Sequence, residues 1–328
     1  MSSDRFLWWT HCGFLCCLLV AGPAGFCWAA SPVPLIFDTD LESDVDDAGT
    51  VAMLHALAAQ GEVRLLAMGV SVKHRWSAPC LDALNTFYGH PDIPVGRLIG
   101  TGIDSGSKYA ETIARAYPTD LDPDQAPDVT QVYRRALATA DDRSVVLVSV
   151  GFLTNIQNLL RSQPDAISPL DGRQLVGRKV RLWVCMGGRF PKGREWNVHR
   201  DASASRYAFV NWPTRVVFSG FEIGVDIQTG AGLKRLPARH AVRRCYELYN
   251  GLQNRSSWDQ TAVLFAVRGL HDKRKVLWQL SMPGWISVQP DGSNTWRADS
   301  QGRHAYLIRK QPPAVIAAQI ERLMMFEP

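Results

Sequence analysis

The chain has 328 residues, with 36 basic and 31 acidic side chains that give a formal net charge of +5. These charges are scattered along the sequence without a block of one sign, which argues against a nucleic-acid partner and indicates an ordinary solvated surface. The length suffices for one large α/β domain with a substantial core, and no repeat or linker interrupts it. We therefore expect residues 31–328 to form a single domain.

The first part of the chain has the pattern of a secretory leader. Arg5 precedes an apolar stretch from Phe6 to Ala21, and the segment ends in the small residues Ala29 and Ala30. An uncleaved membrane anchor is the alternative, but the apolar run is short and interrupted by polar residues. We expect residues 1–30 to be a cleaved signal peptide, the protein to be periplasmic or secreted, and no stable membrane insertion after cleavage.

Cysteine usage points to a chain without a disulfide framework. Four of the seven cysteines lie in the expected leader, which leaves Cys80, Cys185 and Cys245. An odd number at such wide spacing argues against a disulfide framework and a zinc site, although one bridge stays open as an alternative. Cys185 lies in an apolar strand, so we expect a buried thiol there.

Short apolar runs alternate with amphipathic segments after the leader. The run at residues 34–37, the helical pattern at 51–58 and the run at 65–70 form a βαβ opening. Further strands are expected at 95–99, 144–150, 180–186 and 214–219. Nearly unbroken runs of this kind indicate an open, mainly parallel sheet with helices on both faces, whose ligands lie beyond the carboxyl ends of the strands.

The remaining segments have a weaker pattern. Residues 162–178 carry proline, glycine and charged residues without clear periodicity, so we expect a long loop there. After Val276 the pattern changes to short strands, with turns at 291–292 and 301–302. A last helix is expected from Ala314 to Met325.

The strongest functional signal is the acidic segment at residues 38–47, which places five aspartates and one glutamate directly after a buried strand. Repulsion between carboxylates this dense costs several kcal/mol at low dielectric, so a cation or protonation is needed. Oxygen ligands favour calcium or magnesium over zinc, and an EF-hand fits poorly because the mid-loop glycine is missing. Asp44 or Asp46 could instead cap a helix that starts near Asp47, but caps do not account for all six side chains.

The DTD…DVDDA pattern at Asp38, Asp40, Asp46 and Asp47 resembles the signature of nucleoside hydrolases, in a variant with a longer loop. The resemblance implies their Rossmann-like fold. It also implies that Asp40 is both a calcium ligand and the general base for the attacking water, that Asp47 is a calcium ligand, and that Asp46 meets a ribose hydroxyl. Compared with the commoner DTDPGIDDA form, two additional residues leave the role of Asp44 open.

Two further segments resemble the same family in the expected order. Residues 148–156 resemble the strand-to-helix turn usually written GPLTN, in which the residue before the glycine, here Val150, offers its carbonyl oxygen to calcium. A plain β-turn-α connection fits this segment equally well. Residues 186–201 resemble the MGG…E-x-N…D segment, in which Glu195 and Asn197 bind ribose hydroxyls and Met186 packs on the sugar.

Local reasoning adds two expectations for this second segment. Glu195 and Asn197 would alternate in an extended stretch and so face the same side. The alternative is a polar surface loop, and for Asp201 we favour a cap on the helix at 202–210 over a ligand role.

The last match is the segment 256–263, which resembles the one that supplies a late aspartate at the start of a buried helix. By that resemblance Asp259 is a calcium ligand that also meets a ribose hydroxyl, although Ser257 would make an ordinary cap there. The position before it is often a histidine, proposed to protonate a purine leaving group, and here it is Trp258, which could stack on the base. His74 or His199 could assist the leaving group instead.

These matches imply calcium-dependent hydrolysis of the N-glycosidic bond of a ribonucleoside or related riboside, releasing base and ribose, by a dimer or tetramer. The reaction develops positive charge on the sugar, which surrounding carboxylates stabilise. One alternative is a non-catalytic secreted protein that binds riboside and calcium, suggested by Trp258 and by Lys73, where relatives often have a glycine-asparagine pair. Another is a magnesium-dependent phosphatase of the haloacid-dehalogenase type with Asp38 as phosphoryl acceptor, which leaves Asp46, Asp47 and Asp259 unexplained.

Overall fold

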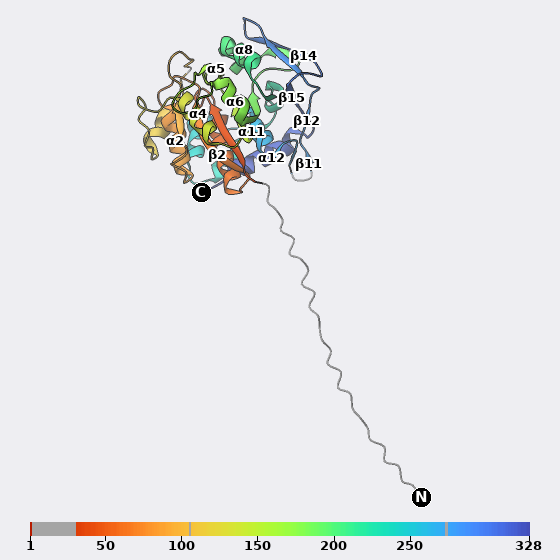
Figure 1. Ribbon diagram of the computed structural model, residues 1–328. Helices are drawn as coiled ribbons and strands as arrows, with labels where there is room; N and C mark the ends of the chain where they lie inside the picture. The colour runs from red at the N-terminus through yellow and green to blue at the C-terminus, as the bar shows by residue number, and fades with distance from the viewer. Residues whose placement is uncertain (2–30, 105, 273–274) are drawn as a thin grey trace. The chain divides into compact units, whose positions relative to one another are not determined.

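The apolar runs of the sequence form the strands of one large sheet in the computed structural model (Figure 1). Seven strands run parallel in the order β3-β2-β1-β4-β5-β7-β15. They are β1 (Val33–Thr39), β2 (Val63–Val70), β3 (Val95–Arg97), β4 (Val145–Ser149), β5 (Val180–Met186), β7 (Arg215–Ser219) and β15 (His304–Arg309). Because these strands are parallel, their carboxyl ends meet at one edge of the sheet.

The sheet continues past β15 with antiparallel strands. These are β12 (Trp278–Leu280), β13 (Gly284–Val288), β14 (Ser293–Ala298) and β6 (Lys192–Arg194). The turns expected at 291–292 and 301–302 connect β13 to β14 and β14 to β15, as the sequence predicts.

Helices cover both faces of the sheet and enclose two hydrophobic clusters. One face carries α1 (Asp46–Ala59), α2 (Ser77–Phe87), α3 (Ala110–Ala116), α10 (Ala241–Asn250), α11 (Trp258–Arg268) and α12 (Pro313–Met324). The other carries α4 (Val129–Thr139), α5 (Thr154–Arg161), α6 (Gly172–Lys179) and α8 (Ala202–Asn211). Leu35 and Phe37 point into the first cluster and Ile36 into the second, which is the period-two alternation of a strand buried on both sides. The α/β class with a mainly parallel sheet is therefore confirmed.

Short elements complete the described chain. They are α7 (Trp196–Arg200), α9 (Phe221–Gly224), the 3-10 helix Ala231–Arg235, β8 (Gln228–Thr229), β9 (Arg255–Ser256), β10 (His271–Asp272) and β11 (Lys275–Val276).

The long loop expected at 162–178 is partly wrong, because its second half is α6. Asp171 accepts a hydrogen bond from the backbone N–H of Gln174, whose side chain bonds back to the Asp171 N–H, so a capping box starts this helix. Two glycines within the helix hide its periodicity in the sequence. The first half is a true loop that Arg134, buried on α4, holds through hydrogen bonds to Ser162 and Asp165.

The structure describes residues 1, 31–104, 106–272 and 275–328. Residues 31–328 form one compact unit. The signal peptide expected at 2–30 lies outside the described residues and stays a prediction. Within the described ranges no helix has the length and apolar character to cross a membrane. Cys80, Cys185 and Cys245 are buried and free, so the bridge that the sequence left open is not formed.

Candidate active site

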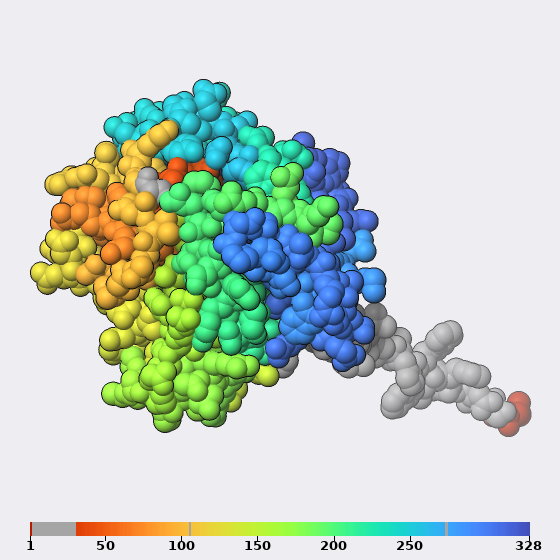
Figure 2. Space-filling view, turned by 90° about the horizontal axis from the view of Figure 1, so that it is seen from above, coloured from red at the N-terminus to blue at the C-terminus, as the bar shows by residue number. Residues whose placement is uncertain are grey.

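A cavity of about 340 Å³ opens at the carboxyl ends of the parallel strands. Figure 2 shows a recess on this face, with the red-orange segment that follows β1 at its floor, between green and cyan parts of the chain. Every site residue that the sequence predicts lies on its wall: Asp40, Asp46, Asp47, Val150, Met186, Glu195, Asn197, Trp258 and Asp259. Six further residues line it: Ser43, Asp44, Trp196, Phe221, Tyr249 and Arg255.

Four buried carboxyl groups form one acidic cluster in this cavity. Oxygens of Asp46, Asp47 and Asp259 all lie within 4.8 Å of one another, although the last comes from α11 and the others from the start of α1. Asp40 adjoins this group of three through a hydrogen bond to Asp47. Burial, followed by repulsion between neighbouring carboxylates, raises the pKa of Asp40, Asp46 and Asp259 well above the usual range.

Two helix N-termini hold the cluster in place. Asp46 is the first residue of α1, and its Oδ2 accepts hydrogen bonds from the backbone N–H groups of Trp258, at 3.1 Å, and Asp259, at 3.3 Å. Asp46 therefore caps α11 and not α1, where neither Asp44 nor Asp46 is the N-cap residue. Ser257 does not cap α11 either, because its hydroxyl bonds to that of Thr229 at 2.7 Å. The partial positive charge at both helix starts favours carboxylates there.

Asp40 and Asp47 are fixed by the loop after β1. Asp47 Oδ1 accepts hydrogen bonds from the Thr39 hydroxyl and, at 3.1 Å, from the Leu41 N–H. These bonds lower the pKa of Asp47, but burial outweighs them and the net shift is upward. The turn after β4 passes so close that a Cβ on Gly151 would lie 2.6 Å from the Asp40 nitrogen. Only glycine fits between the two loops without moving one of them.

Glu195 and Asn197 lie on the wall opposite the acidic cluster. The extended stretch expected for them is wrong. Glu195 is the N-cap of α7 and Asn197 is a helical residue. The Glu195 carboxylate accepts three backbone hydrogen bonds, from Gly188, Asn197 and Val198, at 2.9–3.1 Å. Burial nevertheless raises the pKa of Glu195 to about 7. A helix cap, rather than strand alternation, brings both side chains to the cavity.

Asn197 connects the ends of β4 and β5. Its Nδ2 donates to the Val150 carbonyl oxygen at 2.7 Å and lies 3.3 Å from the Met186 sulfur. The Val150 oxygen has two lone pairs, so one remains for a further partner in the cavity.

Aromatic side chains form the remaining walls. The Trp258 indole N–H donates to the Phe221 carbonyl oxygen at 2.9 Å, and the two rings lie 5.5 Å apart. Trp258 therefore has its one donor satisfied and offers the cavity a ring surface. Trp196, at the entrance, is 49% exposed. Arg255 pairs with Asp44 at 2.5 Å, which gives Asp44 a partner that the sequence did not identify.

Several residues considered from the sequence lie off the cavity wall. Asp38 Oδ2 accepts from the Tyr133 hydroxyl at 2.6 Å and Asn155 Nδ2 at 2.7 Å, and burial raises its pKa to about 7. A phosphoryl acceptor would have to face the cavity, and Asp38 does not line it. The geometry therefore argues against the phosphatase alternative. His74, bonded to Ser77, and His199 are also absent from the wall. Asp201 caps α8 as expected, through the Ala204 N–H.

Sequence reasoning missed five wall residues: Ser43, Trp196, Phe221, Tyr249 and Arg255. Ser43 and Trp196 lie inside the segments 38–47 and 186–201, but their residue types carried no signal there, and the other three lie outside every segment that the sequence singles out. For Phe221 the available signal was position, since it follows β7 at the same edge of the sheet as the other loops.

A parallel sheet whose carboxyl edge holds an acidic, cation-competent pocket defines an α/β protein with a small-ligand site in its loops. The family model described as inosine-uridine preferring nucleoside hydrolase matches residues 35–296, and the chain belongs to this family. Membership and fold together indicate hydrolysis of ribosides.

Solved structures with the same fold include a plant nucleoside hydrolase, PpNRh1, with 16% identity and a TM-score of 0.65 over 90% of this chain and 99% of that one. A purine-preferring ribonucleoside hydrolase from Gardnerella vaginalis has 16% identity and a TM-score of 0.66, over 89% and 99%. The type III effector protein XopQ, complexed with adenosine diphosphate ribose, has 15% identity and a TM-score of 0.67, over 90% and 94%. No curated protein sequence matches the chain.

Proposed function

We propose that this protein is a calcium-dependent hydrolase of the N-glycosidic bond of a ribonucleoside or related riboside. The observation that carries the proposal is the buried cluster of Asp46, Asp47 and Asp259, contiguous with Asp40 and facing Asn197 across one cavity. A riboside presents vicinal hydroxyls, which suit carboxylate and amide partners, and a planar base, which suits the aromatic walls.

The donors in the cavity fit a hard divalent cation. They are carboxylate oxygens and the free lone pair of the Val150 carbonyl, and oxygen donors of this kind favour calcium or magnesium. Burial and then repulsion between neighbouring carboxylates raise the pKa values of these aspartates, and a cation bound among them would favour their ionised forms. Asp40, Asp47, Asp259 and the Val150 carbonyl would hold it, and Asp46 stands close enough to join or to orient a sugar hydroxyl. Bound there, calcium would orient a water and two sugar hydroxyls.

The side chains themselves perform the remaining tasks. Asp40 accepts the proton of the attacking water. Asp46, Asp259 and Asn197 hold the sugar hydroxyls, and Met186 packs against the sugar. The negative charge of the cluster stabilises the cationic sugar as the C–N bond lengthens.

The test is hydrolysis of a panel of ribosides by the purified protein, with calcium and with a chelator, while bound metal is measured by mass spectrometry. We expect turnover with calcium, loss with the chelator, and loss in Asp40→Asn, which preserves shape. Asp38→Asn is the matched control, because it changes a buried aspartate of the same strand that lies off the cavity wall. Phosphatase activity that depends on Asp38, or turnover that survives Asp40→Asn, would contradict the proposal.

A binding protein without turnover is the alternative function, because Trp258 stands where a leaving-group histidine is common. The panel separates the two functions when riboside binding is measured by calorimetry beside hydrolysis. ADP-ribose belongs in the panel because XopQ was crystallised with it. Tight binding without release of any base would establish the alternative.

Export and assembly are also proposals. We propose cleavage of the leader near residue 30 and delivery to the periplasm or medium, which mass spectrometry of the mature N-terminus after fractionation would test. We further propose a homo-oligomer, a dimer or tetramer, which light scattering on the purified protein would test.

A further inference from the structure

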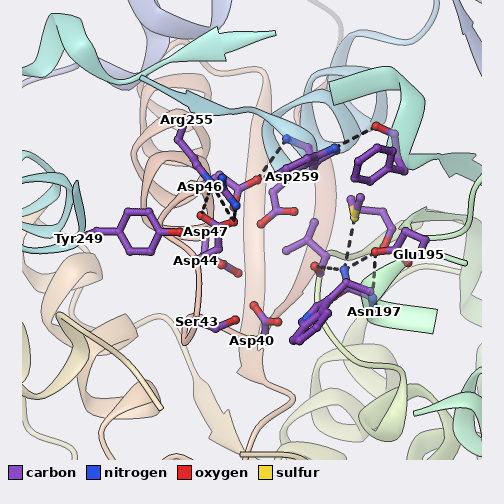
Figure 3. A pocket seen from close by; sticks show the side chains of 15 residues that line it. Asp40, Ser43, Asp44, Asp46, Asp47, Glu195, Asn197, Tyr249, Arg255 and Asp259 are labelled. Atoms are coloured by element: carbon purple, nitrogen blue, oxygen red, sulfur yellow. Dashed lines mark hydrogen bonds and ion pairs between the residues drawn. The ribbon is translucent and has the colours of Figure 1, made fainter. Parts of the chain in front are cut away.

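Arg255 is the one basic residue on the described wall of the cavity. It lies on β9, three residues before Trp258, on the side of the cavity away from Glu195 and Asn197 (Figure 3). Six carboxyl groups share this cavity with it. Among the described side chains of the wall, Arg255 is therefore the one whose charge attracts a ligand group that becomes negative during a reaction.

The guanidinium is held in one orientation. Nε donates to both carboxylate oxygens of Asp44, at 2.9 and 3.0 Å, and Nη2 donates to one of them at 2.5 Å. The guanidinium carbon lies 5.1 Å from the Trp258 ring centroid and 6.0 Å from that of Tyr249. Asp44 thus occupies Nε and Nη2, and within the described part of the chain Nη1 has no hydrogen-bond partner.

Trp258, next to Arg255, cannot act as a general acid toward the leaving base. The one N–H of Trp258 already donates to Phe221, so the indole contributes a ring surface and no proton. Arg255 keeps its own charge, because the hydrogen bonds and charge of Asp44 raise its pKa above the ordinary arginine value. The pair of Trp258 and Arg255 therefore offers a stacking surface beside a fixed cationic donor.

We propose that Arg255 binds the departing base of the substrate, with Asp44 as its positioning residue and Trp258 as the stacking surface. The inference rests on the proposed function and deepens it. The substrate class is a riboside whose base leaves as an anion and carries a ring nitrogen or carbonyl oxygen that accepts from Nη1. The C1′–N bond breaks with its electron pair going to the base, the water oxygen bonds to C1′, and the water proton passes to Asp40. The base anion leaves paired with Arg255 and takes a proton from solvent.

The experiment compares inosine and uridine with p-nitrophenyl riboside, whose nitrophenolate leaves as a stable anion without help. In Arg255→Met we expect kcat/KM on the nucleosides to fall about 100-fold or more, the usual loss for one preorganised donor, while the nitrophenyl substrate is nearly unaffected. Retained nitrophenyl activity also shows that the variant folds. Arg255→Lys keeps the positive charge but loses the planar set of N–H donors, so its kcat/KM on the nucleosides should lie between those of the wild type and Arg255→Met.

Matched variants separate this role from a structural one. Arg75 also lies over a tryptophan, Trp76, and pairs with an aspartate, Asp124, but away from the cavity, so Arg75→Met should leave the ratio of the two activities unchanged. Asp44→Asn should lower the ratio of nucleoside to nitrophenyl riboside activity less than Arg255→Met does. The double variant should lose no more nucleoside activity than Arg255→Met alone.

An equal loss on both substrates in Arg255→Met, or no loss on either, would overturn the role of Arg255 and leave the proposed function standing. A wild-type protein that hydrolyses neither substrate would overturn the proposed function and this inference with it.

Discussion

Removal of calcium at two pH values tests the acidic cluster most directly. Three carboxyl groups lie within 4.8 Å of one another. At an effective dielectric of about 20, each ionised pair at that distance costs about 3.5 kcal/mol, so three pairs cost on the order of 10 kcal/mol. Total folding stability is typically about 5–15 kcal/mol. We therefore expect the metal-free protein to retain protons on these groups instead of bearing the full repulsion.

This proton retention fixes the direction of the pH dependence. The pKa values of Asp40, Asp46 and Asp259 are raised in the folded state, and those of Asp38 and Glu195 are raised to about 7. The unfolded chain loses these protons near pH 4, so between that pH and the raised values unfolding releases protons. The metal-free protein should therefore be more stable at pH 6 than at pH 8. Calcium requires ionised carboxylates, so it should stabilise the protein more at pH 8.

Thermal unfolding followed by circular dichroism, with EDTA and with calcium at pH 6 and pH 8, measures both effects. Calcium at 100 times its Kd should add about 2.7 kcal/mol to the free energy of unfolding. Each kcal/mol should raise Tm by roughly 2 °C in a protein of this size. Asp259→Asn removes two of the three repulsive pairs, so it should raise the metal-free Tm at pH 8 and weaken the response to calcium. A metal-free protein that is more stable at pH 8 than at pH 6, or a Tm indifferent to calcium, would refute the reasoning.

Three substitutions test other parts of the structure. Gly151→Ala should lower both Tm and kcat, because the new Cβ would lie 2.6 Å from the nitrogen of Asp40, the proposed general base, and displace it; an unchanged kcat would contradict this reasoning. Glu195→Gln places an NH₂ group against one backbone N–H of the α7 cap and should cost about 1–3 kcal/mol of stability, measured by urea unfolding. Arg134→Met removes the hydrogen bonds that the buried Arg134 guanidinium donates to Ser162 and to the partly exposed Asp165, remote from the cavity, so it should lower Tm while kcat per folded molecule stays constant.

The parts of the fold that the sequence predicts are those whose signal is local. β1, β2, β4, β5 and β7 are apolar runs bounded by polar residues, and each lies within one or two residues of its expected position. The same argument placed the acidic segment at the carboxyl end of β1. Parallel strands bring such ends together, so the candidate site followed from the strand order without any knowledge of distances.

What the sequence could not supply depends on partners far apart in the chain. The sequence suggests that Asp46 caps its own helix. In the structure its Oδ2 instead accepts hydrogen bonds from the first backbone N–H groups of α11, more than 200 residues later. Glu195 and Asn197 look like alternating strand residues, but Gly188 and Val198 bind the Glu195 carboxylate and start a helix. In each case the same local pattern permits two structures, and only tertiary hydrogen bonds decide between them.

Two departures from the family pattern belong to one structural feature. The longer loop after β1 supplies Asp44, and the position before Asp259 carries Trp258 in place of a histidine. Arg255 contacts both, with an ion pair on one side and a ring on the other. A histidine at 258 could deliver a proton, whereas a tryptophan cannot, so a chain with tryptophan there needs another way to stabilise the departing base. By the inference above, an arginine fixed by an acidic residue from an extended loop would meet that need without proton transfer. The loop insertion and the loss of the histidine are therefore expected to vary together, and restoring histidine at 258 should reduce the dependence of turnover on Arg255.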